Sequence, residues 1–97
     1  MSVQFQAPAA VAGDAAHVNA RYLVVGPSDP GFLSRLVEPM AKLGEVPTRV
    51  HASRESGDGS ELSVDLRLSA VSPRTAELVE NALRRIVGVR QVIAVVE

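Results

Sequence analysis

The sequence contains no cysteine, few aromatic residues and no excess of charge of either sign. The absence of Cys excludes a disulfide framework, a thiolate metal site and a cysteine nucleophile together. Because 10 basic residues stand against 11 acidic ones, the chain has no broad positive surface for nucleic acid or an anionic membrane. Its aromatic residues, Phe5, Tyr22 and Phe32, are too few to form a base-stacking surface. The remaining function classes need neither thiol chemistry nor a basic face.

No hydrophobic run approaches the roughly 18–20 residues that a membrane-spanning helix needs. Residues 1–16 hold no Lys or Arg and no Leu-rich core, so they do not resemble a signal peptide. We expect them to form a disordered extension, and residues 17–97 to form one cytoplasmic domain. His17 and His51 have no nearby cluster of metal ligands, so neither a metal site nor a cofactor is predicted.

The first half of the domain has the pattern of a strand, a turn and a helix. Residues 17–25 suit a strand that ends at Gly26-Pro27. A helix is predicted over residues 30–43, because apolar residues recur there at three- and four-residue steps. Asp29 is the candidate N-cap, Pro30 takes the first helical position, and Gly44 ends the helix.

The second half repeats this pattern after one additional strand. It predicts a strand over 46–54, a strictly alternating strand over 62–69, a helix from Ser72-Pro73 to Gly88 and a strand over 89–96. The order predicts an α+β, ferredoxin-like βαββαβ fold, with a four-stranded antiparallel sheet of order 4-1-3-2 and two helices on one face. The second strand is then an exposed edge, and pairing it with another copy would cover its backbone groups. We expect a homodimer; the alternative is a monomer whose edge is protected by Pro47, Arg49 and Arg54.

The segment GPSDPGFLSRL, residues 26–36, joins the first strand to the first helix. A helix start carries backbone N–H groups without partners and positive partial charge, so it can hold a carboxylate. Gly31 would let a ligand approach the backbone closely. The alternative is a turn that only starts a helix, with Asp29 occupying the same N–H groups. An acylphosphatase-like enzyme is disfavoured, because the turn has no basic residue and Arg35 lies a full turn inside the helix. We find no catalytic residues.

The order of elements, the run Gly31-Phe32-Leu33-Ser34-Arg35 and the helix-ending Lys42-Leu43-Gly44 resemble an ACT domain, a small amino-acid-sensing module. Within that group the chain is most similar to the regulatory small subunits of acetolactate (acetohydroxyacid) synthase. The resemblance covers residues 18–97. It implies edge-to-edge dimers that bind an amino acid between the first turn of one chain and the second strand of its partner. The implied effector-binding residues are Ser28, Asp29, Gly31, Phe32 and Leu33, and the implied dimer edge contains Val46, Thr48, Arg49 and Val50.

The resemblance also implies a non-catalytic role, in which the chain activates a thiamine-diphosphate-dependent catalytic subunit and senses a branched-chain amino acid. One position departs from the family pattern, because Val46 stands where effector-binding members carry Asn. The second hypothesis is a free-standing ACT-like dimer that binds an amino acid or a protein partner. A third and weaker one is a small enzyme on the same fold. Neither nucleic acid nor a membrane is expected as a partner.

Overall fold

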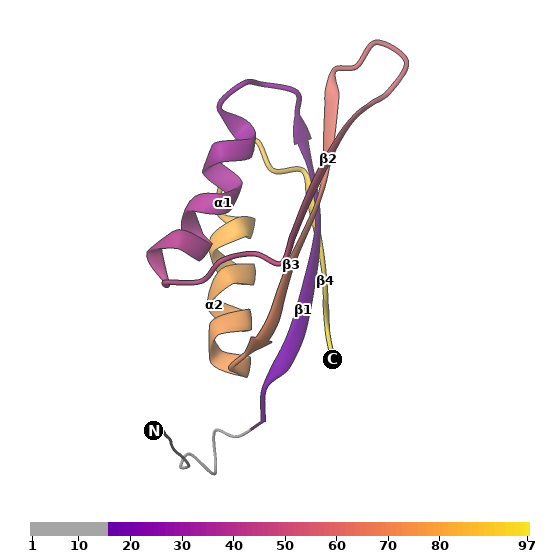
Figure 1. Ribbon diagram of the computed structural model, residues 1–97. Coiled ribbons are helices and arrows are strands. Elements are labelled where there is room, and N and C mark those ends of the chain that lie inside the picture. The colour runs from indigo at the N-terminus through magenta and orange to yellow at the C-terminus, as the bar shows by residue number, and fades with distance from the viewer. Residues whose placement is uncertain (1–15) are drawn as a thin grey trace.

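The computed structural model describes residues 16–97, which form one four-stranded antiparallel sheet with two helices on one of its faces (Figure 1). The predicted fold is confirmed, since the strand order β2-β3-β1-β4 is 4-1-3-2 read from the other edge. Of the predicted disordered extension, residues 1–15 lie outside the described part. The elements are β1 (Val18–Pro27), α1 (Phe32–Lys42), β2 (Arg49–Glu55), β3 (Glu61–Val71), α2 (Pro73–Arg84) and β4 (Gln91–Val96).

The core lies between the sheet and the two helices. Alternate residues of β3 point into it, and Val64, Leu66 and Leu68 are buried as the strict alternation in the sequence predicts. Tyr22 of β1 is completely buried, and its hydroxyl donates a hydrogen bond to the Ala76 carbonyl of α2 at 2.7 Å. Burial raises the pKa of Tyr22 to about 12, with a smaller effect of Glu80, so the phenol stays neutral and ties α2 to β1.

The boundaries of all four strands differ from the prediction. β3 runs over Glu61–Val71 rather than over residues 62–69. β1 does not end at Val25 but continues through Gly26 and Pro27, which pair with Leu62 and Glu61. β2 begins at Arg49 rather than at residue 46, because Pro47 has no N–H group for a ladder and the chain joins β3 only after it. β4 begins at Gln91 rather than at residue 89.

The two helices also have corrected ends. The start of α2 is confirmed, because the Ser72 hydroxyl accepts a hydrogen bond from the Thr75 N–H at 3.0 Å. α2 ends at Arg84, however, and a turn leads from there to Gly88 at φ +99°. α1 begins at Phe32, so the prediction that Asp29 caps it and Pro30 opens it was wrong. The N-cap is Gly31, which has no side chain to cap with.

The two ends of the described chain meet at one end of the sheet. Asn19 and Glu97 exchange backbone hydrogen bonds of 3.1 and 2.9 Å, which join the start of β1 to the end of β4. In the part of the chain that the structure describes, neither helix is long and apolar enough to cross a membrane.

Candidate effector site

The turn between β1 and α1 rests on a close contact between Gly26 and Phe32. A Cβ atom at Gly26 would lie only 2.2 Å from Cζ of the Phe32 ring, so the ring sits directly on the glycine backbone. Phe32 is completely buried, and Gly88 approaches the same ring from the turn before β4. The first residue of α1 is thereby fixed against the end of β1.

Of the first four backbone N–H groups of α1, two donate hydrogen bonds to the described residues. Phe32 N–H donates to the Asp29 carbonyl at 2.9 Å, and Arg35 N–H donates to the Gly31 carbonyl at 3.2 Å. Within residues 16–97, no acceptor is in hydrogen-bond range of the N–H groups of Leu33 and Ser34. They lie at the positive end of the helix dipole, which favours an anion.

The Asp29 carboxylate does not occupy these N–H groups. Its Oδ2 pairs with Nη2 of Arg35 at 3.2 Å. The Arg35 guanidinium also lies over the Phe32 ring, 5.9 Å from the centroid. A Cβ atom at Gly31 would come within 2.9 Å of Arg35 Nη1, so the guanidinium covers the backbone of the turn itself. The alternative in which Asp29 fills the helix start therefore does not hold.

The opposite wall of the site comes from the β2–β3 hairpin. A depression of about 380 Å³ is lined by Ser28, Asp29, Pro30, Leu33, Arg54 and Leu62. The Ser28 N–H donates to the Ser60 carbonyl at 3.1 Å, which ties the turn to the hairpin. Arg54 donates through Nε to the Gly59 carbonyl at 3.2 Å, so its guanidinium is held at the hairpin end. The depression thus has an aspartate on one side and an arginine on the other.

Of the five implied effector residues, the structure brings four to this opening. Ser28, Asp29 and Leu33 line the depression and Gly31 forms the helix start beside it. Phe32 lies beneath, completely buried, so its side chain supports the turn and does not face the opening.

Only two of the four implied dimer-edge residues lie on β2 itself. Arg49 and Val50 lie on β2, which pairs with β3 on one side and has no strand on the other among the described residues. Thr48 precedes β2, and both its N–H and its hydroxyl donate to the Arg67 carbonyl, at 2.8 and 3.3 Å. Val46 lies in the connection from α1 and is 82% exposed.

Sequence reasoning missed the positions of Arg35 and Arg54. Helix side chains lean toward the N-terminus and meet residues four positions earlier, so the spacing from Gly31 to Arg35 was a usable signal. Arg54 could not be placed in the same way, because only the pairing of β2 with β3 brings it to the turn.

The family model described as an ACT-like domain matches residues 13–95. The chain belongs to the ACT-like domain family. No curated protein matches it in sequence.

Solved ACT domains and related modules share the fold of this ACT-like chain at low sequence identity. The ACT domain from GTP pyrophosphokinase of Chlorobium tepidum is 15% identical with a TM-score of 0.66, covering 82% of this chain and 100% of that one. The C-terminal domain of the MgtC protein from Mycobacterium tuberculosis is 12% identical with a TM-score of 0.64, covering 84% and 88%. The regulatory subunit of aspartate kinase from Thermus flavus is 19% identical with a TM-score of 0.57, covering 84% of this chain but only 56% of that one. These likenesses show the fold alone.

Proposed function

We propose that this ACT-like chain is a binding module that dimerises through β2 and holds an amino acid at the start of α1. The observation that supports it is the helix start itself, where the N–H groups of Leu33 and Ser34 have no acceptor within residues 16–97 and Asp29 is drawn aside by Arg35. These N–H groups would donate hydrogen bonds to the ligand carboxylate. Asp29, about half exposed, would face the ammonium group. The chain itself would make or break no bond.

The narrower form of this proposal is a regulatory small subunit of acetolactate synthase that activates a thiamine-diphosphate-dependent partner. It rests on the sequence resemblance, which includes residues 31–35 and 42–44, since the family match reaches only the ACT-like domain. Co-purification of the chain with such a catalytic subunit from native extract would support it. Co-purification with a different enzyme would replace it and leave the binding module in place.

Calorimetric titration with valine, leucine and isoleucine tests the effector site. We expect at least one to bind the full chain at millimolar or lower concentration, and Gly31→Ala to weaken that binding about tenfold or more. The added Cβ meets Arg35 Nη1 at 2.9 Å and crowds the mouth, while φ −85° and ψ −8° suit alanine, so the variant should still fold. Gly57→Ala is the matched control, because a Cβ there meets nothing within 4 Å. If none of the three amino acids gives a measurable heat of binding, the proposed role of this site is wrong.

The oligomeric state tests the edge. Light scattering on the 10.2 kDa chain should give twice that mass at micromolar concentration, and Val50→Lys should give the monomer, because it places like charges along the paired edges. Val87→Lys changes an equally apolar and more exposed residue, 84% against 43%, in the segment between α2 and β4, and should leave the dimer intact. A wild-type chain that stays monomeric at about 100 μM, which is on the order of the Kd of a weak interface, would contradict the proposal.

A further inference from the structure

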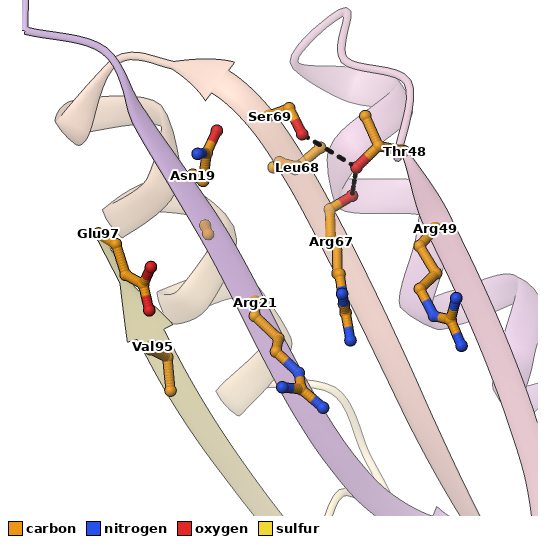
Figure 2. Close-up of a pocket in the computed structure, with 10 residues that line it drawn as sticks. Asn19, Arg21, Thr48, Arg49, Arg67, Leu68, Ser69, Val95 and Glu97 are labelled. Atoms are coloured by element: carbon orange, nitrogen blue, oxygen red, sulfur yellow. Dashed lines mark hydrogen bonds between the residues drawn. The ribbon is translucent and has the colours of Figure 1, made fainter.

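The face of the sheet opposite the helices carries three arginines side by side. The register sets Arg21 of β1 opposite Arg67 of β3, and Arg67 opposite Arg49 of β2 (Figure 2). We call these three residues the arginine row. Like charges directly opposite each other on neighbouring strands are destabilising, so folding alone does not favour such a row.

One carboxylate, that of Asp65, pairs with all three arginines of the row. Asp65 accepts from Arg67 Nε and Nη2 at 3.2 and 3.1 Å, and its Oδ2 lies 3.4 Å from Arg21 Nη2 and 3.9 Å from Arg49 Nε. The hydrogen bonds from Arg67 hold the pKa of Asp65 below its usual range, so it is charged. One negative charge against three positive ones leaves two uncompensated. The side chains of the row are 40–52% exposed, so their donors reach solvent.

The arginine row borders a hollow of about 510 Å³ whose other walls are polar on one side and apolar on the other. Thr48, Ser69 and Asn19 supply the polar wall and Val95 the apolar one. The Ser69 hydroxyl donates to Thr48 Oγ1 at 3.3 Å, which fixes the wall beside Arg67 (Figure 2). Glu97 is the acidic residue that lines the hollow, while Asp65 lies beside the row outside the lining; Glu97 is at the end of β4 beside Asn19, and no ion pair joins it to the row.

We propose that the arginine row binds a compact multivalent oxyanion, a small molecule that carries phosphate or several carboxylates. Guanidinium groups match such oxyanions through paired N–H donors, and three on adjacent strands can engage one ligand from different sides. This site shares no residue with the depression at the β1–α1 turn, so it stands independently of the proposed amino-acid site, while Thr48 and Arg49 also belong to the implied dimer edge.

Two other occupants fit less well. Nucleic acid would need stacking platforms, but the aromatic residues within 16–97, Tyr22 and Phe32, are both completely buried. A second copy packed face to face would set the row against another arginine row or against the apolar side of the face, where Ile93 and Val95 lie. Neither arrangement neutralises the two surplus charges.

Titration of the full chain with pyrophosphate and, separately, with citrate tests the proposal at low ionic strength. We expect binding at micromolar to low millimolar concentration, weakened about tenfold by Arg67→Gln or Arg21→Gln. Asp65→Asn should tighten binding about threefold or more, because it removes the acid that competes with the ligand. Glu97→Gln should act in the same direction, and its exposed position keeps that test valid if Asp65→Asn fails to fold. Arg74→Gln on α2 is the control, since that arginine is 75% exposed and lies on the helical side.

The outcomes separate the ligand classes. Binding of pyrophosphate alone assigns phosphate-bearing ligands, citrate alone assigns polycarboxylates, and both together assign the shared charge and shape. The proposal is overturned if neither pyrophosphate nor citrate binds at about 10 mM, because weaker binding would be no more than an unspecific ion effect. It is also overturned if the folded Asp65→Asn and Glu97→Gln variants bind more weakly, or if Arg74→Gln costs as much as Arg67→Gln.

Discussion

Replacing Gly26 by alanine should destabilise the domain by about 1–3 kcal/mol or more. The new Cβ would lie 2.2, 2.6 and 2.9 Å from three atoms of the Phe32 ring, distances that real Cβ atoms do not show. The ring is completely buried and cannot swing into solvent, so either β1 or α1 has to move. Thermal denaturation should show a melting temperature lower by about 4–8 °C per kcal/mol in a domain of this size.

Gly57→Ala again provides the control, because it adds the same methyl group in open space. Equal melting temperatures for Gly26→Ala and Gly57→Ala would show that the β1–α1 turn tolerates a shift, and the rigid support described for the effector site would be wrong.

Removing the ring has the largest expected effect. Phe32→Ala should cost about 3–5 kcal/mol, because it leaves a cavity where the end of β1, the start of α1 and the turn at Gly88 meet. Small domains have only about 5–15 kcal/mol of stability, so a large fraction of the variant could be unfolded at 37 °C. Urea denaturation followed by circular dichroism measures the loss.

Phe32→Leu keeps most of the apolar volume and should cost much less. In the Phe32→Leu background, Gly26→Ala should become milder, because the atoms that it strikes are gone. This non-additivity would attribute both effects to the one contact. Strictly additive losses would contradict it.

The fold could be predicted from the local sequence, because its helices and strands show regular hydrophobic periodicity and recognisable start residues. The alternation from Leu62 to Leu68 predicted β3 and its buried face, and the pair Ser72-Pro73 predicted the capped start of α2. The start of α1 failed for a physical reason. Asp29-Pro30 has the composition of a cap and a first helical residue, but the charge-assisted pair with Arg35 takes the carboxylate away from the helix.

The candidate sites were predictable only where they are local. Ser28, Asp29, Gly31 and Leu33 are close in sequence, so the turn could be named before the structure was known. The arginine row joins residues 18 or more positions apart on three strands, and its existence depends on their register. A single-residue slip in the register of β3 would turn Arg67 toward the helices. Arg21 and Arg49 would then no longer lie beside it. Scattered arginines in a sequence therefore carry no sign of such a cluster.

The hydrogen bonds between Asn19 and Glu97 bring the start of β1 and the end of β4 to one point of the sheet. A short loop could join them, and new ends could be opened at Gly57 in the hairpin that connects β2 to β3. Such a circular permutant would keep every strand pair while moving the ends of the chain close to the β1–α1 turn. Two domains attached at residues 19 and 97 would therefore lie next to each other. Both would be at the end of the sheet opposite the β1–α1 turn and its proposed effector site (Figure 1).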